Sequence, residues 1–411
     1  MKVFKRILLV LLAVLLLVQI PFIYRRYETG KVAEKIAELD AQRVNREDPK
    51  YKEYKGIIHA HTSLGGHSTG GFDELINAAN ANDLDFVLMT EHYSDKYDTS
   101  ALTLNGVYGK TLFVGGNEID TADGDRFLMI PGSAEAASFR NMPTNAVLEK
   151  LHAENRLALI TYPEKFKSWD SNFDGIEVFS LHTAAKKANP LLAFFDLLWS
   201  YPAYPQLTLM RYLQRPDENL QKFDEIAAKR PISLFAGTDA HSNIGFHVFG
   251  DDAGNRLINI KIDPYEAMFR IARVHVLIEK DKPFDRDSLI DAIRAGRYFI
   301  GFDALGDSTG FDVSESKRRM DESEDIEAGS SPETCAGDVR EPCRFVRFKL
   351  PSKARAVVLR NGQPFLDIPD TTDVELKITN QGEFRIEVYR DDLGSPFDKM
   401  PWIISNPIYV R

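Results

Sequence analysis

Histidines and acidic residues recur in this chain where short apolar segments end. The first pair is His59 and His61, separated by one residue at the end of the segment GIIHA. Residues i and i+2 of a strand point to the same side of a sheet, so both imidazoles can reach one ion. The residues in such positions are His59, His61, His67, His92, Glu118, His182, Asp239 and His241. Because imidazoles and carboxylates together suit Zn, Mn or Fe, the pattern predicts a site for divalent metal ions.

The chemistry that clustered divalent ions support best is hydrolysis. They lower the pKa of a bound water and stabilise the negative charge that develops on a phosphoryl or acyl group. We expect a phosphate ester as the substrate, which would make the protein a phosphoesterase. Hydrolysis of a carbamate, amide or carboxyl ester at the same ions is an open alternative. So is a non-catalytic metal-binding protein tethered to a membrane.

The elements that must bring these residues together are short strands alternating with helices over residues 51–303. Helical patterns occupy Phe72–Asn82, Thr144–Asn155, Leu191–Tyr201 and Leu220–Lys229. Strands that alternate with helices predict parallel βα units, and about seven such units favour a barrel whose strand ends open onto one face. Residues 122–125, with the sequence ADGD, predict a hairpin tip within this region.

The N-terminal part of the chain predicts a membrane anchor. Residues Ile7–Tyr24 are almost wholly apolar, and their helical rise of about 27 Å just spans a bilayer. No small-x-small site follows, so we predict an uncleaved signal anchor over residues 1–26, with a cleaved signal peptide as the alternative. Residues 27–50 are expected to contain a short stalk helix. Basic residues before the apolar run place the N-terminus in the cytoplasm, so the catalytic part is expected on the exported, periplasmic or extracellular side.

The C-terminal part has a different pattern. Residues 304–344 are mostly polar and predict a linker with the first strands of a new unit, and residues 345–411 predict a small all-β, sandwich-like domain. Cys335 and Cys343 lie in a polar loop, where buried thiols are uncommon. A disulfide between them would suit an exported protein.

The charge balance limits the classes of partner. Acidic residues outnumber basic ones by 61 to 51, giving a formal charge of −10. Nucleic-acid-binding proteins usually present a basic face, so we expect no nucleic acid and instead a small-molecule substrate. The membrane is the other expected partner, through the N-terminal helix. The sequence does not indicate an oligomeric state.

Three further features of the sequence have alternative interpretations. The apolar insertion Ala184–Met210 predicts either helices packed on the barrel or a lid over the site that dips toward the bilayer. His152 and His275 lie inside helix or strand patterns and are interpreted as structural. His247 follows the segment DAH by six residues and is a candidate substrate-binding residue.

The motifs HAHTSLGGHS, TEH, GNE, LH and GTDAHS, in this order, resemble those of the PHP (polymerase and histidinol phosphatase) superfamily. The resemblance covers residues 54–302, and the tail, which ends PWIISNPIYV, resembles the branch that includes carbamate-hydrolysing enzymes. It implies a distorted (β/α)7 barrel that holds two or three divalent metal ions.

The resemblance also implies how the ligands divide among the ions. The first ion would have His59, His61, Glu118 and Asp239; the second Glu118, as a bridge, and His182; the third His67, His92 and His241. Where the family usually has a further histidine before proline, this chain has Tyr162, so the second ion would have fewer ligands. Tyr162 is expected to face the ions, and the catalytic candidates are Glu118, Asp239, Tyr162 and Lys165.

Overall fold

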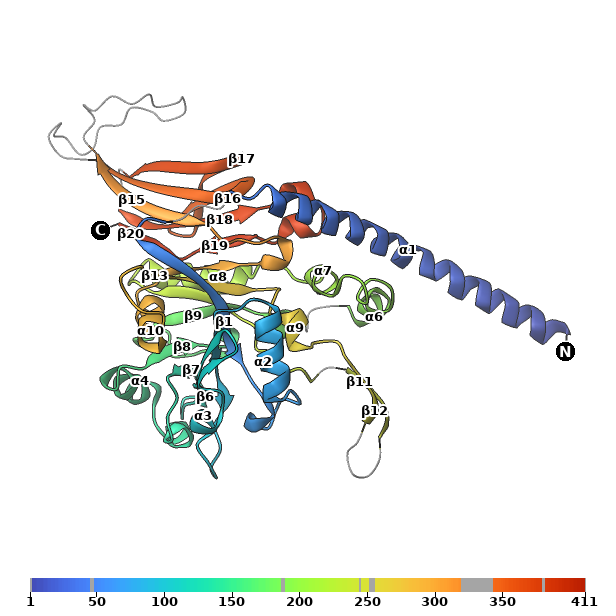
Figure 1. The fold of residues 1–411 in the computed structure, drawn as a ribbon, viewed down its shortest axis with the longest axis horizontal. Helices are drawn as coiled ribbons and strands as arrows, with labels where there is room; N and C mark the ends of the chain where they lie inside the picture. The colour runs from blue at the N-terminus through green and yellow to red at the C-terminus, as the bar shows by residue number, and fades with distance from the viewer. Residues whose placement is uncertain are drawn as a thin grey trace.

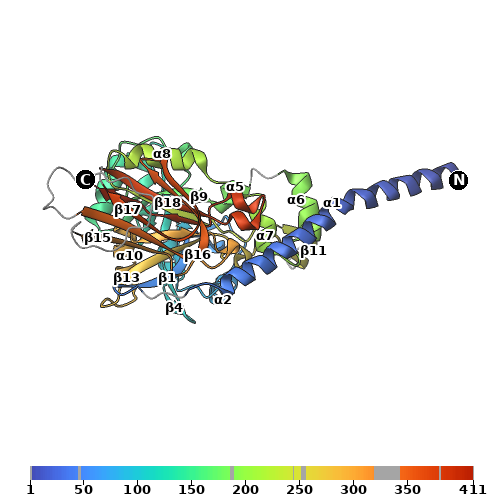
Figure 2. The same ribbon diagram turned by 90° about the horizontal axis from the view of Figure 1, so that it is seen from above.

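The computed structural model describes residues 2–44, 48–185, 189–243, 245–250, 256–318, 343–378 and 381–410. It is a mixed α/β protein in which a long N-terminal helix projects from a body of sheets and helices (Figure 1). Seen from above, the same helix leaves the body at one end and carries the N-terminus far from it (Figure 2).

The N-terminal helix α1 runs without interruption over Lys2–Ala41 and contains Pro21. The predicted stalk helix is therefore the second half of α1 rather than a separate element. The apolar half is long and apolar enough to cross a membrane, as the sequence predicts. The exported location of the body stays a prediction.

The described strands of the body form two large sheets and a separate two-stranded hairpin. In the first sheet, the site-bearing region contributes β1 (Tyr51–Ala60), β2 (Phe86–Met89), β4 (Gly106–Tyr108), β5 (Thr111–Val114), β13 (Arg273–Glu279) and β14 (Tyr298–Gly301). The second sheet contains β3 (Glu91–His92), β6 (Asn117–Asp120), β7 (Arg126–Ile130), β8 (Leu157–Ile160), β9 (Gly175–Ser180) and β10 (Ser233–Gly237). The hairpin pairs β11 (Gly245–Gly250) with β12 (Arg256–Lys261).

The predicted closed barrel of parallel βα units is not formed among the described residues. The strands β1, β2 and β5 are parallel, but β6, β7 and β8 run antiparallel. The reason is local: the predicted tip at residues 122–125 joins β6 to β7 as a hairpin, which needs no helical crossover. The two sheets meet where Thr90 alone separates β2 from β3, and at an isolated parallel bridge between Ala60 and Ala240.

The helices lie around these sheets. They are α2 (Phe72–Ala81), α3 (Thr99–Leu102), α4 (Thr144–Ala153), α5 (Leu181–Ala185), α6 (Pro190–Trp199), α7 (Pro205–Met210), α8 (Asp217–Ala227), α9 (Tyr265–Met268) and α10 (Arg286–Arg294). The four predicted helices correspond to α2, α4, α6 and α8, with bounds shifted by a few residues. Within the insertion, α7 packs against α9 as the first interpretation predicts, whereas α6 packs against α1.

The C-terminal strands extend the first sheet. They are β15 (Asp312–Arg318), β16 (Cys343–Arg360), β17 (Gln363–Ile378), β18 (Gly382–Tyr389), β19 (Ile403–Ser405) and β20 (Ile408–Val410). Because β19 pairs with β14, the predicted all-β part shares a sheet with the site-bearing part. The domain boundary at residues 303 and 304 stays a prediction. Cys335 and the side chain of Cys343 lie outside the described residues, so the disulfide also stays a prediction.

A buried ion cluster lies between β13 and the turn after β14. The Nδ1 atom of His275 is 2.6 Å from Oε1 of Glu53, and its Nε2 atom is 3.3 Å from Oδ2 of Asp303. Burial alone would lower the pKa of His275, but the charges of Asp303 and Glu53 outweigh it and raise that pKa to about 9. These contacts agree with the structural interpretation of His275.

We expect the stability of the fold to fall as the pH rises from about 6.5 to about 9. In this range folded His275 keeps a proton that the unfolded chain has released. The contribution of His275 to the free energy of unfolding should therefore fall with a slope approaching about 1.4 kcal/mol per pH unit. Urea unfolding of the detergent-solubilised chain at several pH values measures this slope. His275→Gln should flatten the slope, and an unchanged slope in this variant would contradict the assignment.

Candidate metal centre

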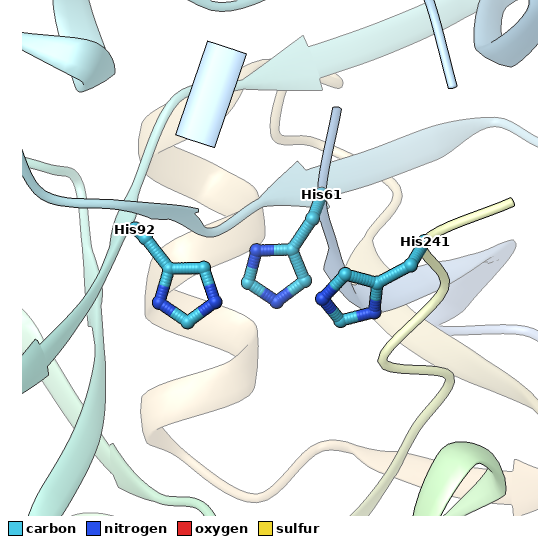
Figure 3. A group of neighbouring side chains, drawn as sticks. All are labelled: His61, His92 and His241. Atoms are coloured by element: carbon cyan, nitrogen blue, oxygen red, sulfur yellow. The ribbon is translucent and has the colours of Figure 1, made fainter. Parts of the chain in front are cut away.

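The strand ends bring most of the predicted ligands into one region. His59 and His61 come from the end of β1, His92 from β3 and Glu118 from β6. Asp239 and His241 follow β10, and His182 lies in α5, directly after β9. Figure 3 shows the imidazoles of His61, His92 and His241 side by side, although they come from three separate segments.

The backbone at three of the site positions adopts the left-handed region. The φ angles are 72° at His59, 52° at Tyr162 and 47° at Asp239. For residues with bulky side chains this conformation is costly, and such strain concentrates at functional sites. At His59 the pairing of β1 with β2 also shifts register, so this side chain is re-aimed by an irregularity in the strand.

Four ligand atoms converge at the buried centre of this region. Nε2 of His61 lies 3.3 Å from Oε2 of Glu118 and 3.4 Å from Oδ1 of Asp239. Nε2 of His59 lies 3.6 Å from the same oxygen of Glu118 and 3.4 Å from that of Asp239. All four side chains are buried, and within the part of the chain that the structure describes none of the four atoms has a hydrogen-bond partner.

These atoms fit a divalent cation. Two ligands that are each about 2.1 Å from a tetrahedral ion lie about 3.4 Å apart, close to the 3.3–3.6 Å of the four imidazole–carboxylate pairs. A buried polar atom without a partner is costly, and here two nitrogens and two oxygens would be satisfied together by one ion. His59, His61, Glu118 and Asp239 are the set that the family resemblance implies for the first ion. Their role as ligands stays a prediction.

The electrostatics of the cluster also suit a cation. Burial lowers the pKa of His61 to about 3, which keeps the imidazole neutral, as a ligand must be. Burial alone would raise the pKa of Glu118, but the neighbouring histidines lower it to about 2, so this carboxylate is charged. Against burial, the charges of Glu177 and Asp239 raise the pKa of His59 well above its usual value. The raised pKa of His59 reflects an excess of negative charge around its ring.

The remaining candidates are grouped differently from the sets that the resemblance implies. Among the described residues, ligand atoms gather in two further groups: His61, His92 and His241, and His182, Asp239 and His241. His61 thus takes the place that was expected for His67. The side chain of His67 is exposed, and the centre of its ring lies 4.6 Å from that of His92. His182 joins Asp239 rather than Glu118. The division of ligands among a second and third ion stays a prediction.

Two charged residues that support the cluster were not predicted from the sequence. Oε1 of Glu177 is 2.7 Å from Nδ1 of His59, and its other oxygen accepts a hydrogen bond from Thr161. Arg126 donates to Oε1 of Glu118 at 3.2 Å. The one sequence signal for Glu177 is that it is an acid inside the apolar segment GIEVFS. Both residues hold the candidate ligands in orientation, as outer partners of metal ligands commonly do.

Tyr162 lies beside the cluster, as expected, and its hydroxyl donates to Oδ2 of Asp239 at 2.7 Å. Burial, together with the charges of Asp239 and Glu118, raises the pKa of Tyr162 far above its usual range, so it remains a neutral phenol. The guanidinium carbon of Arg126 and Nζ of Lys165 each lie 5.4 Å from the centre of its ring. His247 lies on β11, but its side chain is outside the described part of the structure.

A cavity of about 360 Å³ opens next to Tyr162. Its lining includes Tyr162, Glu177, Thr183 and Tyr212. A volume of this size holds a small-molecule substrate, and it adjoins residues that contact two of the candidate ligands.

Tyr162→Phe is expected to lower metal affinity by about 10-fold or more without unfolding the protein, because it removes a hydrogen bond that orients Asp239. Titration of the apo protein with Zn²⁺ or Mn²⁺ measures this affinity. Tyr212→Phe, which removes a hydroxyl from the same cavity away from the cluster, is the matched control. Equal affinities in wild type and Tyr162→Phe would show that the hydrogen bond does not support the site.

The fold is weakly similar to solved structures of other proteins. No protein-family model matches the chain, and no curated protein matches its sequence. A solved structure of PsfC from Pseudomonas syringae PB-5123 is similar, with 12% identity, a TM-score of 0.34, and coverage of 59% of this chain and 89% of that one. Endonuclease Q, in complex with a 27-mer duplex substrate carrying an abasic lesion, gives 12% identity and a TM-score of 0.30. That match covers 60% of this chain and only 56% of the endonuclease.

Proposed function

We propose that this protein is a metal-dependent hydrolase, and that its substrate is a phosphate ester. The observation that carries the proposal is the convergence of four buried ligand atoms from His59, His61, Glu118 and Asp239. They lie 3.3–3.6 Å apart across the imidazole–carboxylate pairs, without hydrogen-bond partners in the described residues. The motif resemblance to the PHP superfamily supports the same chemistry.

The chemistry follows from what each residue holds. A divalent ion in this site would lower the pKa of a bound water and polarise a substrate oxygen. Glu177 fixes the ring of His59 through Nδ1, which leaves Nε2 directed at the cluster. Tyr162 holds one oxygen of Asp239 and leaves the other free of hydrogen bonds within the described structure.

The preference for a phosphate ester rests on the charges beside Tyr162. Arg126 and Lys165 flank its ring, and Tyr162 lines the cavity. Lys165 is exposed and Arg126 partly exposed, so both cations are accessible from solvent. Lys165 would hold an anionic group and stabilise the charge that develops on it, while Arg126 stays paired with Glu118 and Asp120. We propose that the reaction takes place at a membrane surface on the exported side, with the chain anchored by α1.

The test combines metal analysis with a substrate panel on one sample of the full chain in detergent. We expect at least one bound divalent ion and metal-dependent hydrolysis of nitrophenyl phosphates. Hydrolysis of nitrophenyl carbamates or carboxyl esters instead would replace the phosphoesterase assignment by the second hydrolase. Full metal occupancy with no hydrolysis of any substrate would favour a non-catalytic metal-binding protein.

A further inference from the structure

The helix α6 exposes a strongly apolar face. Its sequence is PLLAFFDLLW, and Leu191, Phe194 and Leu198 are 66%, 48% and 56% exposed. Its one charged residue, Asp196, is fully buried. Large apolar side chains gathered on an exposed face indicate a surface that contacts something other than water.

The position of α6 places it beside the apolar run of α1. It lies side by side with α1, near the middle of that helix (Figures 1 and 2). The rings of Phe22 and Phe195 stack at 4.8 Å, and Nε1 of Trp199 donates to Oε1 of Gln19 at 2.8 Å. Gln19 and Phe22 belong to the last turns of the apolar run of α1. The exposed face of α6 therefore lies at the level where α1 would leave the hydrocarbon layer.

Polar contacts fix α6 at this level. Arg25 forms an ion pair with Asp196 at 2.9 Å, and Arg26 donates to the backbone oxygen of Trp199. The hydroxyl of Tyr212 donates to the same carboxylate of Asp196. Basic residues that follow an apolar run are placed at the lipid headgroups, and these two hold α6 beside them. The helix is therefore held against α1 and is not a free lid.

We propose that α6 lies in the interface of the bilayer that α1 spans, with Leu191, Phe194 and Leu198 among the lipids. A short helix whose outer face is apolar and whose charged residue points inward is suited to lie about 5–10 Å into the boundary between headgroups and acyl chains. Tyr212 also lines the cavity next to Tyr162. One hydrogen bond therefore joins the lipid-facing helix to the wall of that cavity, which lies close to the membrane surface.

The experiment is spin-label accessibility in the full chain, reconstituted in phospholipid vesicles. Single cysteines replace Leu191, Phe194 or Leu198 in a background with Cys335→Ser and Cys343→Ser, and each carries a nitroxide. Val107, which is 68% exposed on β4, is the matched control. For the α6 labels, the ratio of collisions with oxygen to collisions with a water-soluble nickel chelate should exceed that of the control several-fold.

Two results would overturn the proposal. Ratios equal to the control would show that α6 faces water, and labels shielded from both reagents would show that a protein surface covers it. Wild-type metal content in each labelled variant would show that the body is correctly folded. The measurement uses no substrate, so its failure would leave the proposed hydrolase activity untouched.

Discussion

Asp239→Asn is expected to lower hydrolytic turnover by more than about 10²-fold, since even the outer partners of metal ligands are worth about 10- to 100-fold. Oδ1 of Asp239 lies 3.4 Å from a nitrogen of each of His59, His61 and His241. The substitution keeps the shape of the side chain but removes the negative charge, and a neutral amide oxygen is a weaker ligand. Turnover at saturating metal and elemental analysis after dialysis measure the two consequences.

The matched control is Asp125→Asn. Asp125 is also buried, but it accepts hydrogen bonds from Thr144 and from the backbone of Lys167, away from the cluster. This variant should keep wild-type metal content and turnover if folded. Wild-type turnover and metal content in Asp239→Asn would remove Asp239 from the site.

The positions of the candidate ligands could be predicted because each depends on local sequence. Short apolar segments such as GIIHA form buried strands, and a polar residue that ends such a segment lies at the end of a strand. His59, His61, His92, Glu118 and Asp239 were found in this way, and the structure brings them together. Sequence spacing did not show which of them share an ion, because that depends on how the strand ends are aimed.

Of the partners that orient the ligands, Tyr162 could be predicted, but Glu177 and Arg126 could not. Glu177 is 118 residues from His59 along the chain, and only the pairing of β9 with β10 brings it near β1. The apolar pattern also could not predict whether neighbouring strands run parallel or antiparallel, because a buried strand has the same apolar sequence in either direction. Hence the hairpin of β6 and β7 was recognised at its tip, while its effect on the predicted barrel was not.

Asp303→Ala is expected to destabilise the fold by about 3 kcal/mol, near the lower end for breaking a buried ion pair. Asp303 is buried and lies 3.3 Å from both Arg273 and His275, whose charges lower the pKa of its carboxyl despite burial. Without the carboxylate, the guanidinium of Arg273 and the imidazolium of His275 face each other in a buried space. His275 retains Glu53, which limits the loss.

The urea-unfolding midpoint of the detergent-solubilised chain at pH 6 measures this effect, because His275 is then charged. Asp367→Ala is the control: it breaks an Arg–Asp contact of 2.6 Å with Arg355, but that pair is exposed and should contribute less than about 1 kcal/mol. The difference between the two variants should shrink above pH 9, where His275 loses its proton. Equal effects of the two substitutions at pH 6 would mean that the buried charges around Asp303 reach water when its carboxylate is removed.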